Sequence, residues 1–254
     1  MGKFDGILLM SDLDGTLCSG DEVSRENCDA IRYFQSEGGL FSIGSGRHPD
    51  YLLHWKDYFV PNTWSAMLNG AVLCDAEGKN FIFDEPSGTD LVEVGLSVMR
   101  DFPEMRSVAF CACTDSAYRL KRGEEFDPSR LPSPVYKGLF SPPKEYSDEY
   151  TARLKELLAP DYLVMRSWFT GIEFQKAGTG KGDAVKRLKL ILGDRARLAV
   201  AVGNYENDID MIAAADVGYA VGDALPSVIQ AADRVTVPFA EHAISQIIRD
   251  LEQR

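Results

Sequence analysis

The sequence has no long apolar segment and no excess of positive charge. No hydrophobic run in the 254 residues approaches the length of about 20 apolar residues that a membrane-spanning helix needs. The N-terminal residues lack the apolar stretch of a secretory signal. The formal charge is -12, which disfavours nucleic acid and anionic membranes because both bind basic surfaces. We therefore expect a cytoplasmic protein with no nucleic-acid partner and no membrane partner.

Cysteine is also scarce. The five cysteines form no pair of Cys-x-x-Cys motifs, and their odd number argues against a disulfide framework. Reduced thiols in a cytosolic chain are expected. The hydrophobic fraction of 45% and the charged fraction of 26% are ordinary for a globular protein. A chain of this length can bury a full core, either as one large α/β domain or as two smaller ones.

Three common phosphate- or metal-binding motifs are absent, although parts of their patterns occur. Residues 44–49 begin like a dinucleotide fingerprint but lack its third glycine. Residues 178–182 lack both the upstream glycine of a P-loop and the hydroxyl residue after Lys181. An EF-hand is excluded because Gly15 follows the second acid directly and Val23 stands where its last glutamate belongs.

The most informative stretch is a short apolar run, residues 7–10, that leads into Asp12-Leu13-Asp14-Gly15-Thr16. Such a run indicates a strand buried on both faces of a parallel sheet. In open α/β sheets, ligands bind outside the carboxyl ends of the strands, where Asp12 and Asp14 would stand. Two carboxylates so close repel each other unless a shared proton or a divalent cation offsets the repulsion, and we favour the cation.

The periodicity predicts a βαβ unit from that strand, a helix over about residues 24–37 and a strand over residues 40–43. Its second strand ends at Ser45, which should face Asp12 across a crevice because parallel strand ends share one edge. The predicted fold class is therefore α/β, with a doubly wound, mostly parallel, Rossmann-like core sheet.

The pattern changes in the middle of the chain. Residues 85–177 read as grouped strands with two helices, which is typical of an inserted α+β domain. The doubly wound pattern resumes at Lys181 and includes a buried strand over residues 198–202. We expect residues 1–84 and 178–254 to form the core and residues 85–177 to form the insert.

Polar residues follow the predicted strands and open a predicted helix. Each one alone is typical of a turn or a helix cap, but together they indicate one site. They are Asp12, Asp14, Ser45, Lys181, Asn204, Asn207 and Asp208.

These motifs resemble those of the haloacid dehalogenase-like (HAD) superfamily, specifically its Cof-type branch with a large α+β (C2-type) cap. The resemblance covers nearly the whole chain. The matching segments are Asp12 to Thr16, Gly44 to Arg47, Lys181-Gly182 and Gly203 to Asp208, with a recurring turn at Asn69-Gly70-Ala71.

The resemblance implies a Mg²⁺-dependent phosphomonoester hydrolase. Its substrate would be a small phosphorylated metabolite, either a sugar phosphate or a phosphorylated cofactor. Asp12 would form an aspartyl-phosphate, and Asp14 would be the general acid and base. The implied phosphate-binding residues are Leu13, Ser45, Gly46, Lys181 and Asn207, and the implied Mg²⁺ ligands are Asp12, Asp14, Asn204 and Asp208. The substrate residues would be Arg47, Asn69 and Arg166, with Trp168, Phe169 and Glu173 as further candidates for the cap surface.

One position departs from the family. Asn204 stands where the fourth motif usually has an aspartate, so it offers Mg²⁺ a neutral oxygen and no charge. Two alternatives therefore stay open: a phosphotransferase or mutase of the same superfamily, and a non-catalytic protein that binds phosphorylated metabolites. We expect a monomer or a weak dimer.

Overall fold

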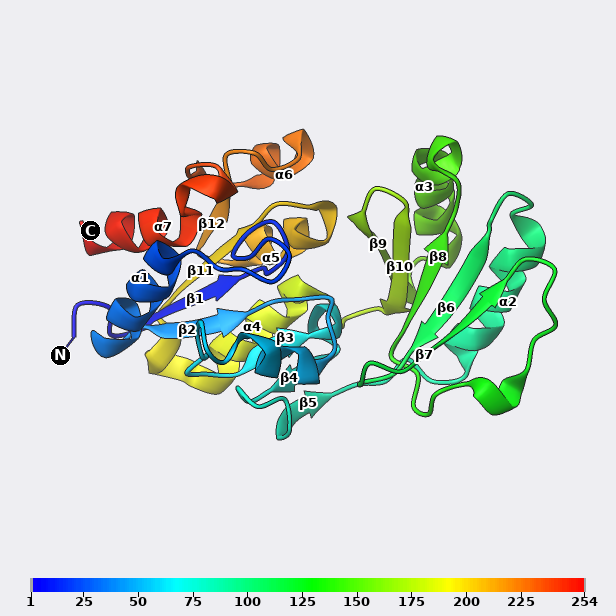
Figure 1. Cartoon of the computed structure of the whole chain (residues 1–254), viewed down its shortest axis with the longest axis horizontal. Coiled ribbons are helices and arrows are strands. Elements are labelled where there is room, and N and C mark those ends of the chain that lie inside the picture. Colours follow the sequence, from blue (N-terminus) through cyan, green and yellow to red (C-terminus); the bar gives the residue numbers. More distant parts are fainter. Residues whose placement is uncertain (1, 254) are drawn as a thin grey trace. The chain divides into compact units, whose positions relative to one another are not determined.

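The computed structural model describes residues 2–253, which form two compact units (Figure 1). The first, here called the core unit, contains the chain up to Phe83 and the chain from Gly180 onward. The second, the inserted unit, runs from Asp84 to Thr179.

The core unit is built on a five-stranded parallel sheet with the order β13-β12-β11-β1-β2. The strands are β1 (Ile7–Ser11), β2 (Leu40–Ile43), β11 (Leu198–Gly203), β12 (Val217–Ala220) and β13 (Arg234–Val235). The helices are α1 (Arg25–Ser36), α4 (Lys181–Leu192), α5 (Ile209–Ala214), α6 (Pro226–Ala231) and α7 (Ala243–Glu252). The predicted α/β class with a parallel central sheet is confirmed.

The two faces of the sheet carry different helices. Helix α4 packs beside α5, and its Leu188 belongs to the same core cluster as Leu8 and Met10 of β1. Helix α1 packs beside α7, as the blue and red helices of Figure 1 show. Side chains that alternate along β1 thus meet helices on both sides, which explains its continuous apolar run.

Helix α1 begins where its sequence predicts. Ser24 is the N-cap, and its hydroxyl accepts the main-chain N–H of Asn27 at 3.2 Å. The Asn27 side chain in turn accepts the N–H of Ser245 at 3.0 Å, so it satisfies the first turn of α7. The inward face carries Ile31 and Phe34, which are fully buried.

The core unit also contains a separate antiparallel sheet. This sheet contains β3 (Ser65–Met67), β4 (Val72–Cys74) and β5 (Phe81–Asp84). Side-chain oxygens of Asn62 and Ser65 accept the N–H groups of Phe41 and Ile43, respectively, so β2 bonds here to side chains. The elements that were not anticipated from the sequence include β13 and the short 3₁₀ helix η1 (Pro49–Trp55).

The inserted unit is an antiparallel sheet with two helices on one face (Figure 1). Its strand order is β7-β6-β8-β10-β9. The elements are α2 (Asp90–Asp101), β6 (Ser107–Cys111), β7 (Ala117–Lys121), β8 (Lys137–Ser141), α3 (Ser147–Leu158), β9 (Tyr162–Trp168) and β10 (Gly171–Lys176). Stacked rings of Phe140 and Phe174, 4.4 Å apart, lie in its core. Within residues 2–253, no helix combines the length and apolar character needed to cross a membrane.

Candidate active site

The register of the parallel sheet brings three chain segments together at Asp12. Ser11, the last residue of β1, pairs with Val202 of β11 and Ile43 of β2. The ladder continues one step further, because the Asp12 N–H donates to the Val202 carbonyl at 3.0 Å and the Gly44 N–H donates to the Ser11 carbonyl at 2.9 Å. The loops after β1, β2 and β11 therefore leave the sheet side by side.

A buried ionic cluster lies at this edge. Lys181 is fully buried at the start of α4, and its Nζ donates to Asp12 Oδ1 at 2.8 Å and to Asp208 Oδ1 at 2.6 Å. Burial lowers the pKa of Lys181, but the two carboxylates outweigh it and the pKa is raised. Burial also raises the pKa of Asp12, and Asp208 raises it further, although Lys181 opposes both. Two carboxylates share one ammonium, so one negative charge is left unbalanced.

The second carboxylate of the cluster is held by main-chain groups. Asp208 Oδ2 accepts the N–H groups of Asn204 at 3.0 Å and Tyr205 at 3.1 Å. A Cβ atom at Gly203 would lie 2.3 Å from the Asp208 Cβ, so glycine is required for this close approach. Both oxygens of Asp208 are therefore occupied within the protein.

Asp210 is a residue that the sequence-based prediction missed. Its Oδ2 accepts the N–H of Gly182 at 3.1 Å, which fixes the first turn of α4 and hence the position of Lys181. Burial raises the pKa of Asp210, although this hydrogen bond opposes the shift. The signal was present in the sequence, because Asp208 and Asp210 repeat the two-residue spacing of Asp12 and Asp14.

Ser45 and the turn near Asn69 also lie at the carboxyl edge of the core sheet. Ser45 is 1% exposed, and its carbonyl accepts the Asn69 N–H at 2.8 Å. The Asn69 Oδ1 accepts the Asn207 side-chain N–H at 3.4 Å, which joins the loops after β3 and β11. Leu68 and Asn69 have φ values of 52° and 57°. Such left-handed residues cost of order 1–3 kcal/mol each and cluster at functional sites.

Asp14 differs from Asp12 in its exposure, since its side chain is 49% exposed. Its carboxylate accepts two hydrogen bonds from Arg47, which follows Gly46 in the loop after β2. The carbonyl of Leu13 accepts the N–H groups of Thr16, Leu17 and Cys18 and so closes the turn around Asp14. Asp14 is therefore half-exposed, whereas Asp12 is buried.

The oxygen atoms that could hold a cation come from carboxylate, main-chain carbonyl and side-chain amide groups. Within residues 2–253, no three His, Cys, Asp or Glu side chains are arranged to hold a metal ion. In the same range, no described hydrogen bond reaches Asp12 Oδ2, the Asp14 carbonyl or the Asn204 side-chain oxygen. Hard cations such as Mg²⁺ accept carboxylate, carbonyl and amide oxygens. This donor set and the unbalanced negative charge fit a divalent cation.

The predicted residues of the inserted unit have different surroundings. Arg166 on β9 forms an ion pair with Asp148 of α3. Trp168 and Phe169 are 44% and 50% exposed at the turn between β9 and β10. Glu173 was expected at the surface, but it is 3% exposed and paired with Lys137. The structure thus brings the other predicted site residues together at the core sheet and places Arg166 in the inserted unit.

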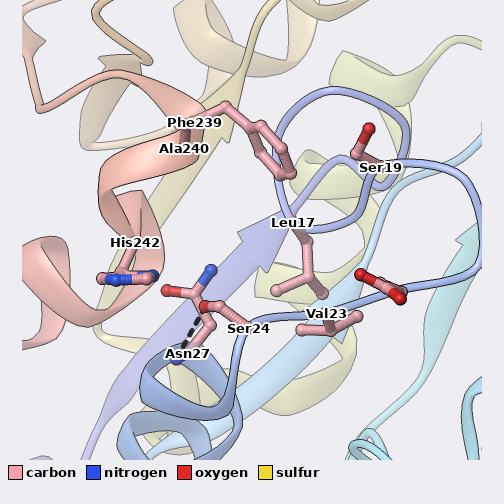
Figure 2. Close-up of a pocket in the computed structure, with 9 residues that line it drawn as sticks. Leu17, Ser19, Val23, Ser24, Asn27, Phe239, Ala240 and His242 are labelled. Atoms are coloured by element: carbon pink, nitrogen blue, oxygen red, sulfur yellow. Dashed lines mark hydrogen bonds between the residues drawn. The ribbon is translucent and has the colours of Figure 1, made fainter.

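A separate pocket of about 280 Å³ lies beside the loop that follows Asp14 (Figure 2). Leu17, Val23, Asn27, Phe239 and His242 are among its lining residues. In Figure 2 the Asn27 side chain projects between α1 and the segment before α7. None of the predicted site residues lines this pocket.

The core sheet, its buried site and the inserted unit together define the class of this protein. An α/β sheet presents a buried aspartate beside a buried lysine at its carboxyl edge, and an α+β unit is inserted in the same chain. The chain belongs to the haloacid dehalogenase-like hydrolase family, whose pattern it matches over residues 9–127 and 120–248. The family predicted from the motifs, in its Cof-type branch, is confirmed.

Relatives match nearly the full length of the chain. The phosphatase YwpJ of Bacillus subtilis is 27% identical, with 96% of this chain and 99% of that protein covered. The 5-amino-6-(5-phospho-D-ribitylamino)uracil phosphatase YcsE of the same organism is 28% identical, with 95% and 94% covered. A solved haloacid dehalogenase-like hydrolase from B. subtilis has a TM-score of 0.80 at 25% identity, with 95% and 98% covered. The predicted enzyme class agrees with these names.

Proposed function

We propose that this protein is a phosphomonoesterase that uses Asp12 as its nucleophile. The observation that carries the proposal is the contact of Asp12 with the buried Lys181 ammonium at 2.8 Å, at the carboxyl edge of the parallel sheet. This contact opposes the effect of burial and favours the ionised, nucleophilic form of the aspartate. Relatives along the whole chain bear the name phosphatase, which supports the same reaction.

The proposed reaction has two halves. In the first, an Asp12 oxygen forms a bond to phosphorus, the ester P–O bond breaks, and Asp14 gives its proton to the leaving oxygen. In the second, Asp14 takes a proton from water, the water oxygen attacks phosphorus, and the bond to Asp12 breaks to release inorganic phosphate. Each atom and proton is accounted for, and both aspartates return to their starting forms.

The remaining core residues bind the phosphate group or orient Lys181 in this proposal. Lys181, Ser45 and the Gly46 N–H would hold the non-reacting phosphate oxygens, where negative charge concentrates in the transition state. The main chain at Leu13 and the Asn207 side chain would complete this shell. Asp208 accepts hydrogen bonds from Lys181 and from two main-chain N–H groups, so we assign it to orienting Lys181.

A metal completes the proposal. Asp12, the Asp14 carbonyl and the Asn204 side-chain oxygen would hold Mg²⁺, whose charge offsets the repulsion between carboxylate and phosphate. Since Asn204 is neutral, this ligand set carries only the charge of Asp12. Weak Mg²⁺ binding is therefore expected.

The substrate class is a small phosphorylated metabolite. We infer that the inserted unit, which has its own core, acts as the cap that selects the substrate. One relative is named for a phosphorylated ribityl compound, which supports sugar and polyol phosphates as the leading class and phosphorylated cofactors as the next.

The test is phosphate release from a panel of phosphorylated sugars, polyols and cofactors, with Mg²⁺ titrated. Three proteins are compared: the parent, Asp12→Asn, and the control Asp250→Asn, which changes an aspartate on α7 outside the site. Release that needs Mg²⁺, survives in the control and is abolished in Asp12→Asn supports the proposal. Transfer of phosphate to an added sugar would indicate a phosphotransferase or mutase instead, and tight binding without turnover would indicate a binding protein.

A further inference from the structure

The contact between Arg47 and Asp14 has a geometry that its contribution to stability does not explain. Arg47 Nε donates to Asp14 Oδ2 at 3.1 Å, and Arg47 Nη2 donates to Asp14 Oδ1 at 2.9 Å. The two side chains are 48% and 49% exposed. Ion pairs as exposed as this one contribute only about 0–1 kcal/mol to stability. The fork does, however, fix both the position and the plane of the carboxylate.

The guanidinium group of Arg47 packs on an aromatic ring. Its guanidinium carbon lies 4.7 Å from the centroid of the Tyr51 ring, which is cation–π geometry. Tyr51 stacks on His54 at 5.5 Å and meets the fully buried Trp55 edge-on at 6.1 Å. We call Tyr51, His54 and Trp55 the aromatic platform. All three belong to η1, the 3₁₀ helix that the sequence pattern did not predict.

The main chain of Arg47 is fixed as well. Its N–H donates to Ser45 Oγ at 3.2 Å, and its carbonyl accepts the N–H of Leu68 at 2.9 Å. Its carbonyl partner Leu68 is one of the two left-handed residues of the turn near Asn69. The backbone and the guanidinium of Arg47 are thus both held within the core unit.

We propose that Arg47, supported by Tyr51, is a positioning residue that fixes the Asp14 carboxylate for proton transfer. This inference rests on the proposed function, in which Asp14 gives and takes protons. Without Arg47, a half-exposed aspartate next to a glycine of φ 78° would sample several rotamers. A proton donor must lie within about 2.6–3.2 Å of the leaving oxygen, and an error near 1 Å can cost about 10²-fold in rate. In this proposal Arg47 acts through Asp14. The family resemblance suggested a different role for Arg47, that of a substrate ligand.

The experiment compares two substrates that differ in their need for a proton. An alkyl phosphate that the parent hydrolyses has a strongly basic leaving group and needs protonation, whereas p-nitrophenyl phosphate does not. With Arg47→Met, we expect kcat for the alkyl phosphate to fall about 10²-fold with KM nearly unchanged. With p-nitrophenyl phosphate, rapid mixing should show a burst of nitrophenol, because the first half-reaction stays fast and the water-dependent second half slows.

Further variants separate positioning from charge and from folding. Arg47→Lys keeps the charge but loses the fork and should recover only part of the rate. Tyr51→Leu keeps Arg47 but removes its support, and it should lower the same kcat by a smaller factor. The control is Arg25→Met, which removes an exposed arginine that pairs with Asp29 at 3.5 Å. It should leave kcat unchanged for both substrates. The midpoints of thermal unfolding show whether each variant is folded.

A double variant tests directly whether Arg47 and Asp14 share one function. If Arg47 acts through Asp14, then adding Arg47→Met to Asp14→Asn should lower the rate by less than about threefold, because the two changes remove one function. Additive losses would overturn the inference, as would a higher KM for both substrates with kcat unchanged, which would make Arg47 a substrate ligand. A parent that hydrolyses no substrate would overturn the proposed function as well, whereas an active parent with an unaffected Arg47→Met would overturn this inference alone.

Discussion

The two units of this protein each bury an ionic cluster, and the clusters differ in their charge balance. In the inserted unit, Lys137 on β8 pairs with Glu173 on β10, and Ser167 donates to the second oxygen of Glu173 at 2.6 Å. This contact itself joins one positive charge and one negative charge. In the core unit, Lys181 meets both Asp12 and Asp208, so one negative charge is in excess.

The difference separates a structural cluster from the proposed catalytic one. Desolvation of a buried ion is costly, and a well-bonded pair of opposite charges compensates the cost internally. An unbalanced cluster is not compensated, so it favours a ligand that brings positive charge. Strongly perturbed ionisable groups of this kind gather at functional sites. On this reasoning the core cluster is where a cation and a phosphate would bind, and the Lys137–Glu173 pair holds the inserted sheet together.

Asp12→Asn is the variant with the largest expected effect, and it tests whether the core cluster carries both the reaction and a surplus negative charge. It should lower kcat by about 10⁴-fold or more, because the nucleophile is lost. It should also raise the free energy of unfolding by about 1 kcal/mol in metal-free buffer, because it removes the surplus buried charge. Steady-state kinetics and urea denaturation measure the two effects. A loss of stability would contradict the idea that this cluster carries uncompensated charge.

The opposite sign is expected for Glu173→Gln in the inserted unit. It leaves Lys137 buried without its counter-charge, so the free energy of unfolding should fall by about 3–5 kcal/mol. Urea denaturation measures this change. The double variant Lys137→Met/Glu173→Leu should recover most of the loss, since it removes both charges. A fall of less than 1 kcal/mol for Glu173→Gln would show that the pair is not structural.

A smaller effect is expected when a charge is added to the core cluster. Asn204→Asp should tighten Mg²⁺ binding about tenfold, because ligand charge tunes the affinity for hard cations. Isothermal titration calorimetry with Mg²⁺ alone measures the affinity directly, without turnover. Gln230→Glu adds the same charge on α6, outside the site, and serves as the control. Equal affinities for Asn204→Asp and the parent would show that residue 204 is not a ligand.

The smallest effect belongs to an ion pair at the surface. Lys189 and Asp216, which are 32% and 36% exposed, lie 2.6 Å apart in the core unit. Lys189→Met should lower the free energy of unfolding by at most about 1 kcal/mol at pH 7. Partial burial raises the pKa of Asp216, but bonds from the Ala199 N–H and Lys189 outweigh it and the pKa is lowered. Such a carboxylate stabilises the fold fully above its unfolded pKa of about 3.9, so the contribution should shrink as the pH falls below that value and disappear below the lower pKa of the folded state. Denaturation of both proteins at pH 7 and pH 3 measures the difference.

Several local features were predictable from the sequence because they depend on nearby residues. The helix expected over about residues 24–37 is α1, which spans Arg25–Ser36, and the strand expected over residues 40–43 is β2, which spans Leu40–Ile43. Capping residues and apolar periodicity specify such elements within one or two turns of chain. Strand β13 has only two residues, Arg234 and Val235, and that length is too short for a period to show.

The pairings inside the site were not predictable in the same way. Lys181 lies 169 residues from Asp12 and 27 residues from Asp208, and nothing near Lys181 in the chain indicates that it bonds to both. The fork between Arg47 and Asp14 and the anchor between Asp210 and Gly182 are likewise contacts between separate loops. Each depends on the order of strands in the sheet, which sets the loops that become neighbours.

By itself, the sequence determined the family, the parallel-sheet class and the strand end at which Asp12 stands, since an apolar run followed by two acids and a glycine is a local pattern. The tertiary structure decided how the charges are shared: Asp208 binds Lys181 and main-chain N–H groups, Arg47 binds Asp14, and Glu173 is buried against Lys137. The physical reason is that the strength of an ionic contact depends on distance and burial, and both are properties of the folded chain.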